Sequence, residues 1–311
     1  MISLRHLLRI ALFISGLSIA LNCNSAFAEE TLKLPKLVLP TLKSYAPSDK
    51  LATLPASNMR ELTMAAKLSE DSDIIEHGIV WRVFKPDASD DGKLPLIATA
   101  NGGTTRFALE PGSYLVHAAF GRTGITKRIT IGIDNRSEIL VMDAGGIKLN
   151  GVLSGGIRIP ADKLHFDIYA SDVQENGERA LILPDVKPED VVRLNAGTYH
   201  IISKYGSVNA IIRSDLKVEA GKLTEATMEH KAAELTLKLV REAGGEAMAD
   251  TAWSVVNPSG EIIQESVGAF ASMVLAAGDY TVIAKNKDKL YQRDFTVVAG
   301  NNQDVEVLVA Q

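Results

Sequence analysis

The histidines are the residues of this sequence best suited to acid–base or metal chemistry, and their spacing argues against both. Five of them lie beyond residue 28: His77, His117, His165, His200 and His230. No two are separated by two or four positions, the spacings that place imidazoles on one face of a strand or helix as a metal-ligand pair. The sequence therefore predicts no metal site and no metal cofactor.

The serines and the cysteine, which could act as nucleophiles, show no catalytic motif either. There is no Gly-x-Ser-x-Gly motif, and the one cysteine, Cys23, lies near the N-terminus. Asn101-Gly102-Gly103 is typical of a turn, because no helical pattern follows it to form a phosphate loop. We therefore predict no enzymatic activity, no catalytic residue and no bound cofactor. A hydrolase whose site assembles only in space stays the least favoured alternative, and it requires a Ser–His or carboxylate pair at hydrogen-bond distance.

Asp87-Ala88-Ser89-Asp90-Asp91-Gly92 is similar to a calcium loop but departs from it twice. The acids stand at positions 1, 4 and 5 instead of 1, 3 and 5, and Ala98 replaces the glutamate that would bind calcium in bidentate fashion. We interpret the segment as the polar tip of a hairpin, and weak calcium binding by a non-helical loop is the alternative.

Carbohydrate sites need exposed aromatic platforms, and aromatic residues make up only 5% of this chain. Both tryptophans fall on a repeated core position described below. Tyr45, Tyr205 and Tyr291 are the rings that we expect to be exposed. A periplasmic carbohydrate-binding or small-ligand-binding protein is therefore an alternative that requires an exposed aromatic patch.

The N-terminus has the three parts of a secretory signal peptide. Arg5 and Arg9 precede an apolar run over residues 10–21, and Ala26-Phe27-Ala28 forms a cleavage site. The run is too short to span a bilayer of about 30 Å hydrocarbon thickness. We expect residues 1–28 to be removed, leaving an exported chain, periplasmic or at the cell surface, with no transmembrane anchor. Asn22 stands before Cys23, where a lipoprotein has a small residue, which disfavours lipidation.

The charge of the expected mature chain limits its partners. Residues 29–311 contain 31 basic and 38 acidic side chains. Nucleic acids and anionic lipids both require a basic protein surface, so this acidic excess argues against either as a partner.

Residues 29–58 form the next predicted segment, an extended linker. Four prolines recur there at intervals of five to eight residues: Pro35, Pro40, Pro47 and Pro55. Each removes a backbone donor and favours extended geometry in the residue before it, so no continuous strand can form. Leu37, Val38 and Leu39 leave open a second interpretation, in which the segment docks on a sheet edge or on another envelope protein.

Beyond the linker, one phrase occurs three times. Leu-x-x-Gly-x-Tyr ends at Tyr114, Tyr199 and Tyr280, which are 85 and 81 residues apart. An aromatic residue precedes each tyrosine by 33, 33 and 27 positions: Trp81, Phe166 and Trp253. This period suits a whole β domain rather than a solenoid repeat. With alternating strands and turn signals in each copy, it predicts an all-β chain of three tandem Greek-key sandwiches, over residues 59–144, 145–231 and 232–311.

The repeated residues suit structural roles. The glycine supplies a turn conformation that side chains resist, and the tyrosine can bury its ring while its hydroxyl bonds a backbone group at the sheet corner. The phrase, with later strands ending in Ala-Gly at residues 220–221 and 299–300, resembles the carboxypeptidase regulatory-like, or prealbumin-like, β-sandwich module. That resemblance implies a seven-stranded Ig-like Greek key and a non-catalytic accessory role. Copy two departs most, with Ile201, Ser203 and an acidic stretch over residues 185–190.

Together these features predict an exported, non-catalytic envelope protein that binds another envelope protein or a cell-surface polymer. Its sheet edges and loops are the expected recognition surfaces. The composition leaves its oligomeric state open.

Overall fold

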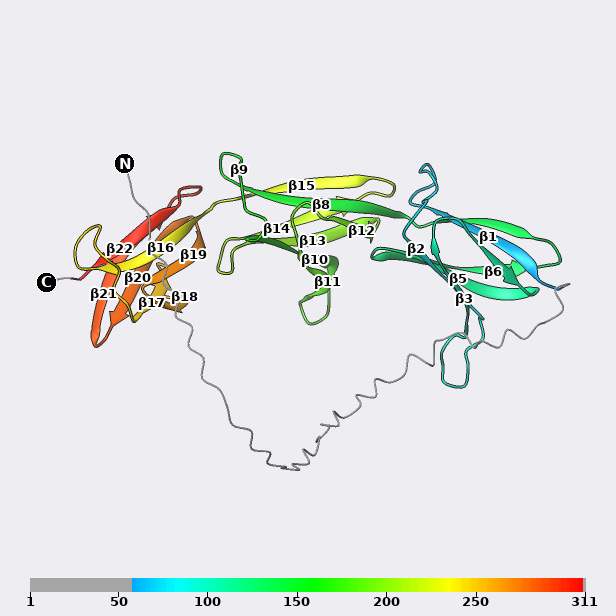
Figure 1. The fold of residues 1–311 in the computed structure, drawn as a ribbon, viewed down its shortest axis with the longest axis horizontal. Helices are drawn as coiled ribbons and strands as arrows, with labels where there is room; N and C mark the ends of the chain where they lie inside the picture. The colour runs from blue at the N-terminus through cyan, green and yellow to red at the C-terminus, as the bar shows by residue number, and fades with distance from the viewer. Residues whose placement is uncertain (1–57, 310–311) are drawn as a thin grey trace, which may run out of the picture. The chain divides into compact units, whose positions relative to one another are not determined.

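The computed structural model describes residues 58–309 (Figure 1). The predicted signal peptide, the linker and Tyr45 lie outside these residues. The regular structure of the described part is entirely strand. The first copy of the repeat, module 1, contains β1 (Arg60–Lys67), β2 (Ile79–Phe84), β3 (Leu96–Gly102), β4 (Thr105–Leu109), β5 (Gly112–Phe120), β6 (Thr123–Ile131) and β7 (Arg136–Val141).

The two later copies repeat this order. Module 2 contains β8 (Ala144–Leu153), β9 (Ile157–Arg158), β10 (Leu164–Val173), β11 (Arg179–Val186), β12 (Val191–Asn195), β13 (Gly197–Tyr205), β14 (Ile211–Val218) and β15 (Leu223–His230). Module 3 contains β16 (Ala232–Val240), β17 (Thr251–Val256), β18 (Ile262–Val267), β19 (Phe270–Ala276), β20 (Gly278–Asn286), β21 (Lys289–Val297) and β22 (Gln303–Leu308).

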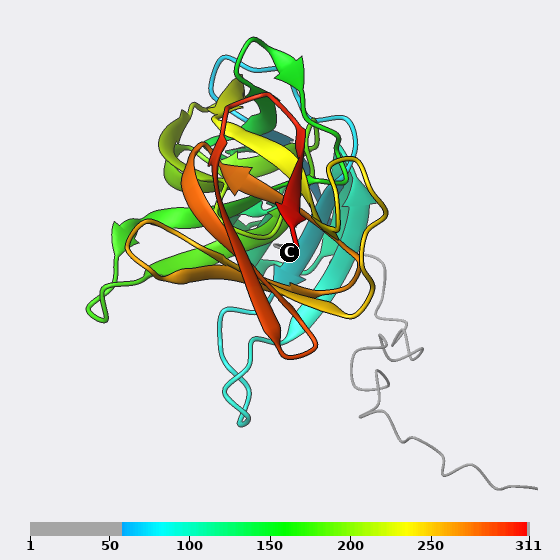
Figure 2. The ribbon, with the colours of Figure 1, turned by 90° about the vertical axis from the view of Figure 1, so that its left-hand side faces the viewer.

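Each module pairs a four-stranded sheet with a second sheet in which the module's first strand lies at the centre. In module 1 the orders are β3-β2-β5-β6 and β4-β1-β7, and in module 3 they are β18-β17-β20-β21 and β19-β16-β22. Module 2 has β11-β10-β13-β14 and β12-β8-β15, with the short β9 added to β8. The first and last strands of each module run parallel, and the other pairs are antiparallel. The predicted all-β fold of tandem sandwiches is confirmed; Figure 2 turns module 3 towards the viewer.

Each module buries its own apolar core between its two sheets. The strands alternate as a half-buried strand must, so that Tyr280, Val282 and Ala284 of β20 face inward. The repeated aromatic residue is the largest fully buried side chain of each core, and Trp81, Phe166 and Trp253 are at most 1% exposed. These residues fill volume, as their repeated position predicted.

The predicted tyrosine corner is confirmed in all three modules. The hydroxyls of Tyr114, Tyr199 and Tyr280 donate to the carbonyl four residues earlier, at 3.0, 2.9 and 3.0 Å. The glycine two positions before each tyrosine has a φ of 156° to 158°, which residues with a side chain rarely adopt. The phrase Leu-x-x-Gly-x-Tyr therefore fixes the bend between the two sheets.

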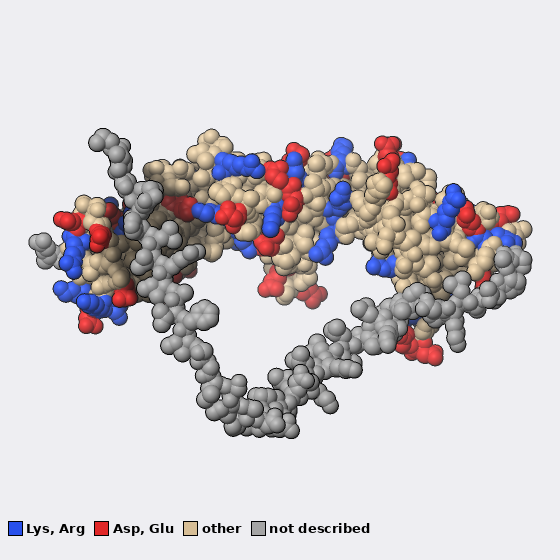
Figure 3. Space-filling model, viewed as in Figure 1, with Lys and Arg blue, Asp and Glu red and all other residues tan. Residues whose placement is uncertain are grey.

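The surface of the described residues carries both charge signs. On the face shown in Figure 3, lysine and arginine side chains lie among aspartates and glutamates, without a broad basic area. Among residues 58–309, no helix is long and apolar enough to cross a membrane.

Candidate functional site

The connection between the two sheets is the feature that distinguishes module 2 from its neighbours. In module 1, β3 passes to β4 through Gly103 and Thr104 alone, and the indole nitrogen of Trp81 donates to the Gly103 carbonyl at 2.9 Å. In module 3, Trp253 donates in the same way to Gly268 at 2.8 Å. A buried indole N–H needs an acceptor, so each tryptophan holds a tight turn against its core.

Module 2 has Phe166 at this position, which has no N–H to anchor a turn. Its connection, residues 187–190, is twice as long, and the pairing of β10 with β11 has three register shifts. Asp185 and Glu189 adopt left-handed backbone conformations, with φ of 54° and 68°. Such conformations are uncommon outside glycine and concentrate at functional sites. In module 2 these two residues direct the backbone away from the course that the two-residue turns of modules 1 and 3 take.

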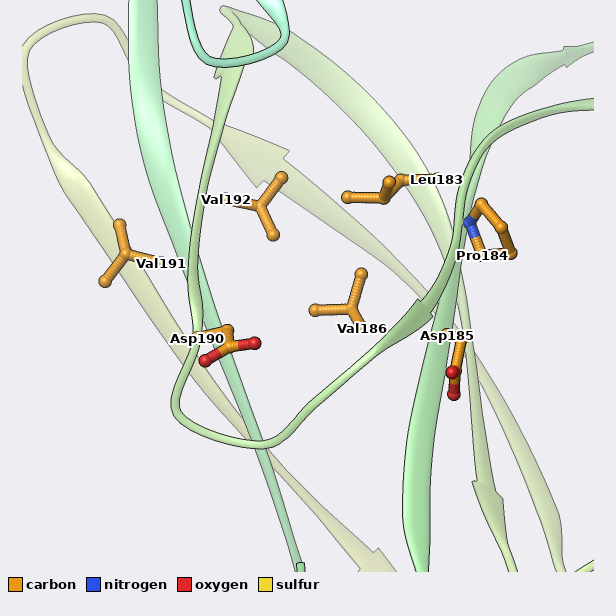
Figure 4. A pocket seen from close by; sticks show the side chains of 7 residues that line it. All are labelled: Leu183, Pro184, Asp185, Val186, Asp190, Val191 and Val192. Atoms are coloured by element: carbon orange, nitrogen blue, oxygen red, sulfur yellow. The ribbon is translucent and has the colours of Figure 1, made fainter. Parts of the chain in front are cut away.

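A groove of about 320 Å³ lies between β11 and β12 as a result (Figure 4). Leu183, Val186 and Val192 point toward one another across it, and Val186 and Val192 are at least 91% buried. Asp185 and Asp190 stand at its rim, both exposed. The groove therefore combines an apolar floor with two carboxylates, and it suits a ligand segment that carries apolar and cationic side chains.

A buried carboxylate supports the rim from below. Asp167 accepts a hydrogen bond from the Asp185 amide at 3.0 Å and one from Lys204 Nζ at 2.5 Å. Burial works to raise the pKa of Asp167, yet these two hydrogen bonds and the Lys204 charge hold that pKa below its ordinary value. Asp167 therefore stays ionised and fixes the left-handed Asp185, whose own side chain is 72% exposed and lies beside His165.

On the other side of the groove, Glu189 is held by β8. Its amide donates to the Leu149 carbonyl at 2.9 Å, and its carboxylate accepts from Asn150 Nδ2 at 2.6 Å. Lys148 Nζ lies 3.5 Å from the same carboxylate. Both ends of the connection are thus anchored, so the groove is a built feature of module 2.

A second hollow, of about 770 Å³, lies on module 1. Ile74 and Ile139 line it, each more than 40% exposed, together with Lys67, Asp73 and Glu76. Its charges are mixed, and no left-handed residue shapes it. It is therefore less specific in chemistry than the groove of module 2.

Ser203 and His230 form the Ser–His contact that the hydrolase alternative required. Ser203 Oγ lies 2.7 Å from His230 Nε2, and both residues are at most 1% exposed. The other side of the imidazole is hydrogen bonded to the Ala210 backbone, and burial lowers the pKa of His230 below its ordinary value. No carboxylate orients this histidine and no solvent reaches the hydroxyl, so the pair satisfies two buried polar groups instead of forming a nucleophile.

The other histidines make separate surface contacts. His200 Nδ1 lies 2.7 Å from Asp215, and His117 Nδ1 lies 2.8 Å from the Thr126 hydroxyl. His165 Nδ1 lies 2.8 Å from an Asp185 carboxylate oxygen but makes no hydrogen bond with it. His77 is almost fully exposed. The structure brings none of these histidines together.

The loop with Asp87 and Gly92 projects from module 1 between β2 and β3 (Figures 1 and 2). It is closed by two backbone hydrogen bonds, from Ser89 to Lys93 and from Gly92 to Ser89. Within residues 58–309, no group of three or more histidines, cysteines, aspartates or glutamates has the geometry of a metal site.

The expected exposed rings are placed differently from the prediction. Tyr205 is 2% exposed, so the expectation for this residue is wrong: its ring packs in the core of module 2, with its edge toward His230 at a centroid distance of 6.0 Å. Tyr291 is half-buried against the core of module 3. Phe270 is 59% exposed, but a single phenyl ring is no platform for a sugar chain.

Residues 234–309 match a family model. It is that of the Rhizobiales growth-associated tandem repeat domain. The matched residues run from β16 to just beyond β22 and so correspond to module 3. None of the curated proteins matches this sequence.

Several solved structures are similar in fold at low identity. The Bacillus anthracis TIE protein is 17% identical, with a TM-score of 0.24 over 81% of this chain and 50% of that protein. The minor pilin GBS52 of Streptococcus agalactiae is 13% identical, with a TM-score of 0.31 over 55% of this chain and 95% of the pilin. The major pilin subunit of Bacillus cereus is 12% identical, with a TM-score of 0.22 over 81% and 100% of the two chains. This chain thus spans half the length of the first of these proteins, and none of the three likenesses bears on activity or partners.

Proposed function

We propose that this chain is an exported, non-catalytic structural protein of the cell envelope that recognises another envelope component through the groove of module 2. The observation that carries the proposal is the contrast in the sheet-to-sheet connection. Where modules 1 and 3 close their cores with a tryptophan-anchored turn, module 2 keeps an apolar groove rimmed by Asp185 and Asp190.

The chemistry of the groove favours a protein segment over a bare polysaccharide. Its floor is formed by aliphatic side chains, which make no stacking contacts with sugar rings, and both rim charges are negative. Apolar burial with charge pairing at the rim is the usual anatomy of a recognition site for an extended peptide. The partner is therefore an envelope protein that presents aliphatic and basic residues.

Photo-crosslinking in intact cells tests the proposal. A photoreactive residue at Val191, which lies at the groove and is 45% exposed, is compared with one at Ile262 on module 3, which is 56% exposed. We expect one protein adduct at position 191 that is absent at position 262. No adduct at 191, or the same adducts at both positions, would overturn the proposal.

Charge removal sharpens the test. Asp185→Asn and Asp190→Asn together keep the side-chain shape, and asparagine tolerates the left-handed backbone at position 185. We expect this double variant to reduce the adduct at least tenfold. The matched control, Glu175→Gln with Glu178→Gln, removes two exposed acids from the same module and leaves the adduct unchanged.

Deletion of residues 29–58 separates the groove from the predicted linker. If the adduct at position 191 survives the deletion, recognition belongs to the groove. If it disappears while modules 1–3 stay folded, the linker carries recognition and the assignment to the groove is wrong.

A further inference from the structure

The two junctions between modules use the same pair of surfaces. The tip of the β5–β6 hairpin of module 1 contacts β12 of module 2, where the Arg122 amide donates to the Arg193 carbonyl at 3.2 Å. The Arg193 guanidinium lies over the Phe120 ring, 4.4 Å from its centroid. One module later, Asn209 at the β13–β14 tip donates to the Tyr280 hydroxyl at 2.8 Å and accepts from the Ala276 amide at 2.9 Å.

The repeat register shows that these contacts are equivalent. Gly121 and Gly206 both stand seven residues after the corner tyrosine, and both have left-handed backbones with φ of 67° and 70°. A Cβ on Gly121 would lie 3.0 Å from Arg193 Cβ, and one on Gly206 would lie 2.8 Å from Val274 Cβ. Arg193 and Val274 each stand six residues before the next corner tyrosine. A donor tip and an acceptor strand therefore recur at a fixed place in the module.

Each end of the array leaves one half of this interface unpaired within the described residues. Module 3 has a donor tip, residues 286–290, in which Lys287 takes the place of Gly121 and Gly206 with a φ of 54°. Module 1 has an acceptor in β4, in which Ala108 takes the place of Arg193 and Val274 and is exposed. Beside this acceptor Ile133 is 78% exposed, and on the donor tip Leu290 is 68% exposed.

The two unpaired halves offer opposite charges, Lys287 and Lys289 against Glu110, but they differ in size from the internal pairs. Both internal junctions set a glycine, which has no Cβ, against a larger residue, whereas the unpaired ends set a lysine against an alanine. The donor tip carries Lys287, Asp288 and Lys289, all exposed, whereas the acceptor carries Glu110 and Glu61, also exposed, with Arg106 3.7 Å from Glu61. At the spacing of the internal junctions, the Cβ atoms of Lys287 and Ala108 would lie about 3 Å apart. Carbon atoms in contact lie about 3.5–4.0 Å apart, so the two surfaces must separate by somewhat less than about 1 Å.

We propose that a second copy of this chain docks the donor tip of its module 3 on the acceptor of module 1. The contact joins two different surfaces, so it does not close on itself as a two-fold dimer does, and it propagates as an open head-to-tail chain. The internal junctions gain from their covalent tether, which the contact between copies lacks. Association is therefore concentration-dependent and weaker than the internal junctions.

Sedimentation of residues 29–311 over a wide range of protein concentration tests the proposal. We expect the mass to rise past that of a dimer without reaching a fixed stoichiometry. Lys287→Glu reduces association at least tenfold because it opposes Glu110, and Glu110→Lys added to it restores association. Lys85→Glu, an exposed charge reversal outside the interface, is the matched control and leaves association unchanged.

Disulfide trapping tests the geometry directly. Residues 29–311 contain no cysteine, so a chain with Ala108→Cys can be mixed with one carrying Lys287→Cys and oxidised. The internal junctions place the corresponding Cβ positions about 3 Å apart, close to the 3.5–4.5 Å of a disulfide. We expect the mixture to give a cross-linked dimer that joins one chain carrying Ala108→Cys to one carrying Lys287→Cys. Either chain oxidised alone should give only its own symmetric dimer.

Three results would overturn the proposal. The first is a monomer at every concentration together with no mixed cross-link. The second is stronger association of Lys287→Gly than of the natural chain, which would show that Lys287 ends the array instead of extending it. Association that appears only after deletion of residues 29–57 would also contradict it, because the acceptor would then be occupied by the preceding segment of the same chain.

Discussion

Modules 1 and 3 resemble each other more than either resembles module 2, although module 2 lies between them in the chain. The outer modules close the path between their sheets in two residues, with an indole N–H fixed to a glycine carbonyl. Module 2 has a phenylalanine, a four-residue connection and a buried Ser–His pair in its core. One fold thus supports a short connection anchored by a tryptophan and a longer connection that leaves a groove beside it.

The comparison teaches where this module tolerates change. The corner tyrosine is the same in all three copies because it sets the bend between sheets. The sheet-to-sheet connection varies, and it is anchored to an indole in modules 1 and 3 but to Asp167 and β8 in module 2. At Ser203, module 2 carries a hydroxyl where the other modules have Ala118 and Ala284, and the hydroxyl is tolerated because His230 accepts or donates the bond.

The largest expected effect concerns the aromatic core residue. Trp81→Ala leaves a cavity in module 1 and should cost about 3–5 kcal/mol of its unfolding free energy. Urea unfolding followed by circular dichroism measures the loss, and Trp253 fluorescence reports on module 3 as an internal control that does not change. A loss below about 1 kcal/mol would show that the indole does not support the core.

A smaller effect isolates the hydrogen bond that distinguishes the two kinds of module. Trp81→Phe keeps a ring in the core but leaves the Gly103 carbonyl without its donor, at a cost of about 1–3 kcal/mol. Hydrogen exchange should rise at the turn between β3 and β4. If stability and exchange are both unchanged, Phe166 does not explain the open connection of module 2.

The buried histidine should make module 2 less stable in acid. Burial lowers the pKa of His230 in the folded state, whereas the unfolded chain keeps the ordinary value of 6.5. Below that value the unfolded state binds a proton that the folded state does not, so stability falls with falling pH, by at most about 1.4 kcal/mol per pH unit. Unfolding curves from pH 7.5 to 5 measure the slope. His230→Gln, which can still bond Ser203, should remove this part of it; an identical slope in both chains would contradict the assignment.

The smallest effect tests what the modules share. Tyr114→Phe and Tyr199→Phe each remove one corner hydrogen bond, and each should cost about 0.5–1.5 kcal/mol. Thermal unfolding of the two variants measures the losses. Clearly unequal losses would show that the corner of module 2 is not equivalent to that of module 1.

The repeated fold could be predicted because its signals are local. The alternation of apolar residues along a strand, the glycine of Leu-x-x-Gly-x-Tyr and the aromatic residue at a constant distance before it each act within one strand or turn. A short-range pattern of this kind specifies backbone conformation and inward-facing side chains. The sandwich, its corner tyrosines and its buried tryptophans follow from it.

The groove, the Ser203–His230 pair and the junction contacts were decided by tertiary packing. Ser203 and His230 are 27 residues apart and meet only because β13 and β15 belong to facing sheets of one sandwich. Tyr205 reads as a surface ring from its neighbours, yet the fold turns it into the core. The acidic stretch at residues 185–190 was visible in the sequence. Whether it covers or opens the core depended on the hydrogen bond that the indoles of Trp81 and Trp253 donate and that Phe166 cannot make. Contacts between residues far apart in the chain carry no local pattern, so the packing of the strands alone determines them.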